Sequence, residues 1–295
     1  MSTTRILFGL NVPAAAGPGA DPVATAVAAE QLGYDFVATS DHPCGDSPTF
    51  ETWTMLTWMA AATSRIRVAS RVLGVPYRNP AMVAKMAETL QRLSGGRLIL
   101  GLGGGYSDDE FRAFGLPVPS ARDKVDGLAD AIRIARGLWS QQAFSHTGRV
   151  HHTDAAQLSP KPDRPIPIWL GTFGPRALAV TGQLADGWIP SLGFAPPDVA
   201  ARMRLRMLDA AAAAGRDPGE ITCAYHLAVR VQDTVRSADP AAEPVTGPPD
   251  ALVERFLGFA ERGFTAFSVA LPGPDPETQR ELFARTVIPA VRAAA

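Results

Sequence analysis

LSGGRLILGLGGGYSDDE, residues 93–110, is the stretch of sequence that decides the fold. Its apolar run from Arg97 to Leu102 is entered through Ser94-Gly95-Gly96 and left through glycines at 101, 103, 104 and 105. A short apolar run between glycines is typical of a buried strand. The acidic residues at 108–110 are typical of the start of a helix. The stretch therefore predicts a strand, a glycine loop and a helix N-terminus, which together present backbone N–H groups to a flat or anionic ligand.

Short apolar runs alternate with amphipathic patterns along most of the chain. The runs predict strands at residues 6–12, 35–39, 66–72, 97–102, 166–170, 187–190, 221–231 and 266–271. The patterns predict helices at residues 21–32, 49–62, 79–93, 120–139, 174–184, 198–214, 249–262 and 277–294. The alternation pauses between residues 106 and 165, where a hairpin is expected over 144–158. Residues 234–249 are expected to form an exposed loop.

Eight β/α units in a chain of 295 residues define the expected fold. Continuous Val, Ile and Leu in the strands fit a parallel sheet that is buried on both faces. The expected fold class is α/β, a single domain over residues 1–295 that closes as a (β/α)8 TIM barrel with an insertion between strands 4 and 5. An open doubly wound sheet is the alternative. However, GLGGGY at 101–106 lacks the G-x-G-x-x-G spacing, and so does the first strand-to-helix turn.

Composition argues against several classes of partner. The formal net charge is −1 and the basic residues are dispersed, so nothing favours nucleic acid. No apolar run approaches the roughly 20 residues that span a bilayer, and the run after Arg5 is too short for a signal peptide. Cys44 and Cys223 lack metal-ligand spacing and are expected to be reduced thiols. We therefore expect a cytoplasmic protein with no membrane partner.

In a barrel of this kind, chemistry collects where the strands end. Asp41 and His42 follow the second strand, and a histidine beside a carboxylate can transfer a proton near neutral pH. Alternatively, His42 only hydrogen-bonds a neighbouring carbonyl. Glycines 103–105 can let a ligand approach the backbone, or can simply form a tight turn. The loop at 171–174, with Arg176, can hold a phosphate at a helix N-terminus, or can be a plain turn.

The other histidines do not predict a metal site. His146, His151 and His152 lie in the expected hairpin without a second carboxylate–histidine pair, so a solvated surface is expected for them. His226, inside the seventh strand, is expected to be a core residue whose hydrogen bonds are satisfied. The G-x-S-x-G motif of a nucleophilic serine does not occur.

Several stretches together resemble the bacterial luciferase-like monooxygenase superfamily, in the branch whose members mostly use the deazaflavin coenzyme F420. The resemblance covers about residues 5–232 and continues weakly to the end. The motifs that carry it are SDH at 40–42, RVLGVPYRNP at 71–80, AKMAETLQRLSGGRL at 84–98, GLGGGY at 101–106, IPIWLGTFGP at 166–175 and ADGW at 185–188.

The resemblance implies a deazaflavin ring beside Asp41 and His42, both of them catalytic, with His42 giving or taking the proton. It also implies a cis non-proline peptide at Arg71-Val72 or one residue earlier. The residues implied to bind the cofactor are Asp41, His42, Ser70, Arg71, Val72, Gly103, Gly104, Gly105, Tyr106, Gly171, Thr172, Phe173, Gly174, Arg176, Pro190 and Ser191. Two features depart from the family pattern. No lysine follows Lys161 to bind a phosphate, and Arg71 stands where a small residue is common.

The activity that the resemblance implies is hydride transfer between coenzyme F420 and a small organic substrate. An FMN-dependent luciferase-like monooxygenase is the alternative, and a non-catalytic flavin-binding barrel is a second one. A homodimer is also implied, through helices that carry Trp58, Met59 and Met82. The segments implied to select the substrate are 44–50, 107–120 and 143–160, but the sequence identifies neither the substrate nor the direction of transfer.

Overall fold

Eight parallel strands close into a barrel in the computed structural model, which describes residues 5–237 and 239–295. Pairing of β9 with β10 and of β12 with β1 completes the ring, so the expected (β/α)8 barrel is confirmed. A two-residue strand, β4 (Leu73–Gly74), also pairs with β5. In order along the chain and around the barrel, the eight strands are β1 (Leu7–Asn11), β2 (Phe36–Thr39), β3 (Arg67–Ser70), β5 (Leu98–Gly103), β8 (Ile168–Leu170), β9 (Gly187–Trp188), β10 (Thr222–Val231) and β12 (Ala266–Ala270).

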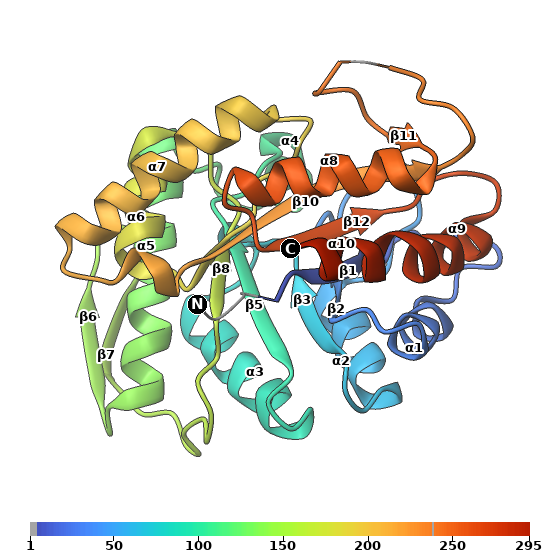
Figure 1. Ribbon diagram of the computed structural model, residues 1–295. Helices are drawn as coiled ribbons and strands as arrows, with labels where there is room; N and C mark the ends of the chain where they lie inside the picture. The colour runs from blue at the N-terminus through green and yellow to red at the C-terminus, as the bar shows by residue number, and fades with distance from the viewer. Residues whose placement is uncertain (1–4, 238) are drawn as a thin grey trace.

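Helices surround the barrel (Figure 1). Several begin with proline in the first turn, where its missing N–H costs no hydrogen bond. The side chains of Asp21, Asn79 and Ser120 accept hydrogen bonds from the first backbone N–H groups of α1, α3 and α5. The helices are α1 (Pro22–Gln31), α2 (Thr52–Ala62), α3 (Pro80–Leu93), α4 (Asp108–Ala113), α5 (Ala121–Ser140), α6 (Pro175–Leu184), α7 (Pro197–Ala213), α8 (Pro249–Glu261), α9 (Pro276–Leu282) and α10 (Ile288–Ala294).

The inside of the barrel is filled by side chains from alternate strand positions, because successive residues of a strand face opposite sides. Gly9 makes room for the ring of Phe36, because a Cβ at Gly9 would lie 2.1 Å from that ring. A second and larger apolar cluster fills the space between the strands and the helices. The buried interior side chains are Phe36, Ala38, Ala69, Ile99, Trp169, Ile189, Ala224 and Ala266.

The expected insertion lies between β5 and β8 and contains an antiparallel hairpin, β6 (Phe144–Thr147) and β7 (His152–Ala156), at the outer side of α5 (Figure 1). Asp130 of α5 holds the hairpin: its carboxylate accepts a hydrogen bond from the N–H of Val150 at 2.9 Å and pairs with Nε2 of His146 at 3.0 Å. The side chain of His146 is only 15% exposed, so the expectation of a solvated histidine was wrong at this position.

Two segments differ from the expected elements. Residues 245–247, expected in an exposed loop, form the buried strand β11 (Val245–Gly247) beside β10. The expected closing helix over 277–294 is divided by a π-helical turn, Phe283–Val287. Pro289 follows that turn and has no N–H to donate to the carbonyl of Arg285, so a regular α-helical pattern cannot continue through it.

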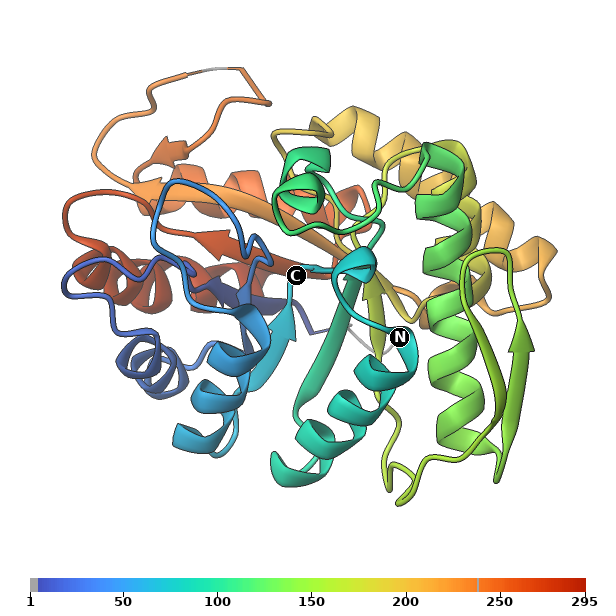
Figure 2. The same ribbon diagram turned by 180° about the vertical axis from the view of Figure 1, so that it is seen from behind.

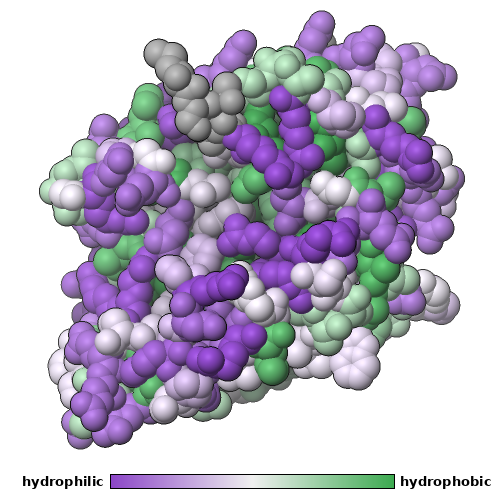
Figure 3. Space-filling view, turned by 60° about the horizontal axis from the view of Figure 1, so that its bottom comes forward, coloured by the Kyte–Doolittle hydropathy of each residue, from purple (hydrophilic) through white to green (hydrophobic). Residues whose placement is uncertain are grey.

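The face of the molecule seen in Figure 3 is mainly hydrophilic, with hydrophobic side chains in small separate groups. None of the helices in the described part of the chain is long and apolar enough to cross a bilayer. Cys44 and Cys223 are free thiols, as expected. Of the residues implied in a dimer, Trp58 and Met82 are exposed, but Met59 is buried and adds nothing to that surface.

Candidate active site

The carboxyl ends of the strands bring the segments at 41–42, 103–106 and 171–174 to one mouth of the barrel. The strands that carry them are near neighbours, since β5 pairs with β8 and only β3 lies between β2 and β5. The ring centroids of His42 and Tyr106 are 6.2 Å apart in an edge-to-face arrangement. Figure 2 shows the loop with α4 above the end of β5. The segments that the sequence singled out therefore face one another.

His42 is held by a carboxylate from the insertion. Its Nδ1 lies 2.9 Å from Oε1 of Glu110, on α4, while Oε2 of Glu110 accepts a hydrogen bond from the Tyr77 hydroxyl at 2.5 Å. Burial, together with the hydrogen bond to Glu110, raises the pKa of Tyr77, so this hydroxyl stays protonated and donates. Because Nδ1 of His42 donates to Glu110, Nε2 is the ring atom left to give or take a proton. The side chain of His42 is 49% exposed and can meet a ligand.

Asp41 has a different environment from His42, although the two are adjacent. Its carboxylate is fully buried and accepts hydrogen bonds from both terminal nitrogens of Arg78, at 2.7 and 3.0 Å, and from the N–H of Gly74 at 3.0 Å. Arg78 also pairs with Glu51, the residue that caps α2. The expectation that the neighbouring carboxylate acts on His42 needs correction: Glu110 does so, whereas Asp41 fixes the backbone that carries His42.

Two glycine loops form one sector of the mouth. The peptide Arg71-Val72 is cis, as expected. The side chain of Val72 lies between the loops: a Cβ at Gly103 would come within 2.7 Å of Cγ2 of Val72, and a Cβ at Gly171 within 3.1 Å. Glycine at both positions therefore lets Val72 pack against the backbone, and this contact brings the loop after β5 close to the loop after β8.

These two loops present hydrogen-bond donors without partners. Within residues 5–237 and 239–295, no protein group accepts from the N–H groups of Gly104, Gly105, Tyr106, Thr172, Phe173 and Gly174. The first turn of α6 also has no side-chain cap. Unpaired N–H groups at a helix start favour an anionic or oxygen-rich ligand. The loops can therefore hold the polar chain and phosphate of a cofactor through the backbone.

Three side chains that were expected to contact the cofactor in this sector instead bond to other groups of the protein. The Ser70 hydroxyl bonds to Gly101, at 2.8 Å from its carbonyl and 2.9 Å from its nitrogen, and so joins β3 to β5. The Thr172 hydroxyl bonds to Thr181 of α6. The guanidinium of Arg176 pairs with Asp126 of α5 at 2.7 Å. In this structure, the hydroxyls of Ser70 and Thr172 therefore hold the strands and helix beneath the site, and Arg176 is engaged outside it.

Aromatic rings line the rim of the same sector. The ring of Tyr106 lies 5.8 Å from that of Phe194, which lies 5.6 Å from that of Phe173. Tyr106 and Phe194 are 73% and 61% exposed, so the rings are open to a ligand. Between β9 and β10, Ser191 pairs with His226, and the carbonyl of Pro190 accepts the N–H of His226 at 2.9 Å. Pro190 and Ser191 thus position the next strand.

The opposite sector of the mouth is polar. Nε of Arg71 donates to Oδ1 of Asn11 at 3.1 Å, and Nδ1 of His226 lies 3.2 Å from Oγ of Ser268. These residues come from β1, the end of β3, β10 and β12, directly above the apolar interior layer. Burial, and then the charge of Arg71, lower the pKa of His226 well below its ordinary value, so His226 is neutral near pH 7.

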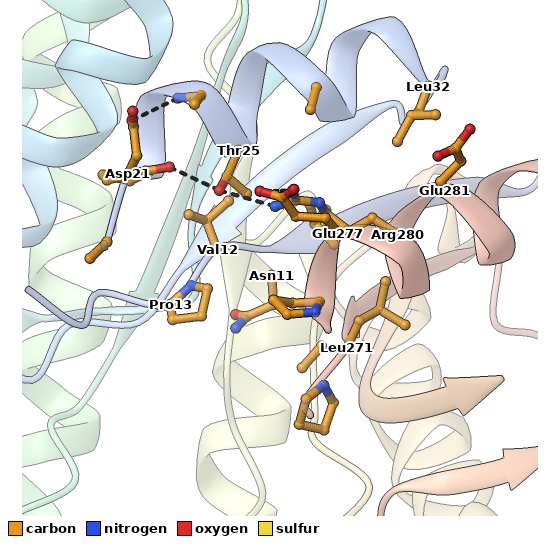
Figure 4. Close-up of a pocket in the computed structure, with 18 of the residues that line it drawn as sticks. Asn11, Val12, Pro13, Asp21, Thr25, Leu32, Leu271, Glu277, Arg280 and Glu281 are labelled. Atoms are coloured by element: carbon orange, nitrogen blue, oxygen red, sulfur yellow. Dashed lines mark hydrogen bonds and ion pairs between the residues drawn. The ribbon is translucent and has the colours of Figure 1, made fainter. Parts of the chain in front are cut away.

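A groove adjoins this polar sector and does not lie at the centre of the mouth. It has a volume of about 860 Å³ and lies between α1 and α9. Figure 4 shows Asn11, Val12 and Pro13 at one side of it and Arg280 and Glu277 farther along. Asn11 lines this groove and also accepts from Arg71, so the groove begins at the edge of the mouth.

Glu110 and Tyr77 are absent from the residues that the sequence singles out for the site. Glu110 was interpreted only as an acidic residue at the start of a helix, and it is indeed in the first turn of α4. Tyr77 stands shortly after the end of β4, which is the one signal that could have included it. Among the described residues, no group of three or more His, Cys, Asp or Glu is placed to hold a metal ion.

Comparison with known proteins defines the class. The chain belongs to the luciferase-like monooxygenase family, whose model matches residues 6–287. Its curated relatives include proteins described as F420-dependent glucose-6-phosphate dehydrogenase. The one from Nakamurella multipartita is 27% identical over 99% of this chain and 98% of that protein. The one from Intrasporangium calvum is 29% identical over 90% of this chain and 93% of that protein. The resemblance inferred from the sequence is thus confirmed for the family and for its F420-dependent relatives.

Solved structures share the fold. An F420-dependent secondary alcohol dehydrogenase in complex with an F420-acetone adduct has a TM-score of 0.86 and 20% identity, and the match covers 97% of this chain and 99% of that one. A long-chain alkane monooxygenase has a TM-score of 0.82 and 13% identity, covering 99% and 92%. Because the sequence identities are this low, the structural similarity establishes that the barrel fold is shared and nothing more.

Proposed function

We propose that this chain is a coenzyme F420-dependent oxidoreductase that transfers a hydride between the deazaflavin and a small organic substrate. The observation that carries the proposal is His42, bound through Nδ1 to Glu110 at 2.9 Å and facing the loop that ends β5. A half-exposed histidine with a fixed tautomer is suited to proton transfer at a reacting carbon. The F420-dependent descriptions of the curated relatives support the choice of cofactor.

Several features of the mouth support the binding of a deazaflavin cofactor. Residues 103–106 and 171–174 would hold its polar chain and phosphate through the six unpaired N–H groups. Val72 would support the ring, and His42 would lie beside it. When bound, the deazaflavin supplies the carbon that accepts or releases the hydride. The absence of lysine after Lys161 is consistent with backbone recognition of the phosphate.

The protein supplies positioning and the proton. Glu110 keeps Nδ1 of His42 protonated, and Tyr77 keeps Glu110 in place. Nε2 of His42 then takes the proton from a substrate hydroxyl during oxidation or returns it during reduction. Asp41 contributes indirectly, because its bonds to Arg78 and Gly74 fix the turn that carries His42.

An FMN-dependent monooxygenase is the second candidate. The family model is that of luciferase-like monooxygenases, and a long-chain alkane monooxygenase shares the fold. Such an enzyme would consume oxygen with reduced FMN, whereas the proposed enzyme changes the oxidation state of F420 without oxygen. A flavin-binding barrel without activity would do neither.

Anaerobic turnover tests the proposal. The protein is mixed with F420 and a panel of alcohols, or with reduced F420 and the matching carbonyl compounds, and the F420 absorbance is followed. We expect turnover that His42→Ala lowers about 100-fold or more, while F420 binding persists. Oxygen consumption with reduced FMN, together with no change in F420, would support the monooxygenase instead. Turnover unaffected by His42→Ala would remove His42 from the mechanism.

The setting of this activity is also part of the proposal. The two free thiols agree with a reducing compartment, which we take to be the cytoplasm. We further propose a homodimer that covers exposed side chains of α2 and α3, namely Trp58 and Met82.

A further inference from the structure

Arg71 is a cation at the mouth without a hydrogen-bonded counterion. Its Nε donates to Asn11, but neither terminal nitrogen donates to any protein acceptor in the described part of the chain. Among residues 5–237 and 239–295, the carboxylate that acts on this guanidinium is that of Glu243, and it does so through its charge without a hydrogen bond. The two terminal nitrogens lack a protein partner, yet they are not among the fully buried polar atoms of the described residues. Both therefore remain accessible to solvent in the mouth. The free edge of the guanidinium is therefore available to a ligand.

The surroundings keep this cation charged without neutralising it. Burial lowers the pKa of Arg71 to about 10, and the charge of Glu243 partly opposes that change. Arg71 therefore carries its charge at neutral pH. A partly buried charge without a hydrogen-bonded counterion is unfavourable, and such groups are normally paired. Binding of an anion would supply the missing partner.

The neighbours of Arg71 offer further hydrogen bonds. His226 is neutral, and its Nδ1 is close to Ser268, which leaves Nε2 for a ligand. The carboxamide of Asn11 holds Arg71 through its oxygen, so its NH2 group is also free to donate. A planar cation flanked by two polar side chains from different strands forms a preorganised subsite.

This subsite lies apart from the sector proposed for the cofactor. The side chain of Val72 points to Gly103 and Gly171, whereas that of Arg71 points to Asn11 on β1 and toward His226 on β10. The two consecutive residues therefore serve opposite sides of the mouth. A ring supported by Val72 would leave the Arg71 side to the other reactant.

We propose that Arg71, together with Asn11 and His226, binds a carboxylate group of the substrate, so that the natural substrates are small organic carboxylates. This inference rests on the proposed function, because it assigns the remaining half of the same mouth. A guanidinium with a free edge matches the two oxygens of a carboxylate. Glu243, whose Oε1 accepts the N–H of Ala228 at 2.6 Å, adds negative charge nearby and disfavours a dianion such as a phosphate monoester. The groove between α1 and α9 gives space beside Asn11 for the rest of such a molecule.

Direct binding of probe molecules tests the carboxylate subsite. Benzoate and its neutral analogue benzamide are titrated calorimetrically into the wild-type protein and into Arg71→Gln, with and without F420. The matched control is Arg67→Gln, which removes the same charge from the start of the same strand, at the other end of the barrel. Thermal melting of each variant verifies that it folds.

We expect the wild type and Arg67→Gln to prefer benzoate over benzamide by about tenfold or more, and Arg71→Gln to lose that preference. Equal binding of benzoate and benzamide by the wild type would overturn the inference, and so would an unchanged preference in Arg71→Gln. Arg71-dependent binding of glucose 6-phosphate without binding of benzoate would also overturn it. If Arg71→Gln instead weakened only the binding of F420, Arg71 would belong to the cofactor and the inference would fall.

These measurements distinguish a failure of the carboxylate inference from a failure of the proposed function. Benzoate preference without F420 present reports only on the subsite, whereas F420 titration reports only on the cofactor. If F420 binds but benzoate does not, the proposed function stands and the carboxylate inference fails. In turnover, Arg71→Gln should raise KM for carboxylate substrates about tenfold or more and change kcat far less. The reason is that the contact with the carboxylate is equally strong in the ground state and in the transition state.

Discussion

Glu110 is the residue on which the proposed chemistry depends most after His42. It joins two residues that are distant in sequence, since it accepts from His42 and from Tyr77 at the same time. A histidine whose Nδ1 is bound to a carboxylate is fixed in orientation and tautomer. Without that bond, the ring of His42 could rotate, since half of it is exposed.

Glu110→Ala should therefore lower turnover about tenfold to 100-fold and leave F420 binding nearly unchanged. The specific readout is the tautomer of His42, which long-range 15N–1H NMR reports. In the wild type, the signal should be that of a ring protonated at Nδ1, and in the variant that preference should disappear. Tyr77→Phe should have a smaller effect of the same kind. An unchanged tautomer in Glu110→Ala would show that other contacts hold the ring.

The sequence predicted His42 and the two glycine loops because each follows a strand directly. It did not predict Glu110, since an acidic residue at the start of a helix is common for reasons that concern only the helix. The sequence also pointed to Asp41 as the carboxylate that acts on His42, whereas Glu110 has that role in the structure. Adjacent residues at a turn can face different directions, and only tertiary structure shows that Asp41 faces Arg78.

At the scale of elements, Glu30 joins α1 to the turn that precedes β3. Its carboxylate accepts hydrogen bonds from the backbone N–H groups of Ser64, Arg65 and Ile66. Burial raises the pKa of Glu30, but these hydrogen bonds outweigh it and lower the pKa from 4.5 to about 2. The folded state thus favours the ionised form of Glu30.

The stability that Glu30 contributes should depend on pH in a defined direction. Because the pKa is lower in the folded state, the contribution is complete above about pH 4.5 and is lost as the pH falls toward 2. Glu30→Gln should reduce the free energy of unfolding at pH 7 by about 1–3 kcal/mol and differ less from the wild type near pH 2. Urea denaturation at several pH values measures this. The control Glu254→Gln, at an exposed position of α8, should show no such pattern. A constant difference between Glu30→Gln and the wild type at every pH would contradict the assignment.

Most elements followed from local sequence, because apolar runs, first-turn prolines and capping side chains act within a few residues. The exceptions depend on other causes. Strand β11 is short and forms only through its pairing with β10, which no local pattern reveals. The π-helical turn before Pro289 shows that a proline inside a helical pattern should have been interpreted as an interruption.

At the scale of the whole molecule, the proposed homodimer makes a testable surface. Trp58 and Met82 are 68% and 58% exposed on consecutive helices of the ring. We expect sedimentation equilibrium to show a dimer and Trp58→Glu to weaken it at least tenfold, because a charge would replace buried apolar area. Arg202→Glu on α7 serves as the control. A wild-type protein that sediments as a monomer at all concentrations would contradict the proposal.

The closed barrel explains why segments far apart in the sequence form one site. Parallel strands end at the same side, so eight loops share one mouth, and the alternation of strands and helices was enough to predict this. The division of the mouth into a glycine sector and an Arg71 sector could not be predicted, because it depends on where Val72 and Arg71 point.

The central claim is that this mouth binds a deazaflavin, and equilibrium titration of the wild-type protein with F420 and, separately, with FMN tests it most directly. We predict saturable binding of F420 at about micromolar concentration, as expected for loops whose backbone donors hold the cofactor chain. Binding of FMN should be weaker, in line with the F420-dependent descriptions of the curated relatives. Micromolar binding of FMN with no binding of F420 would contradict the claim.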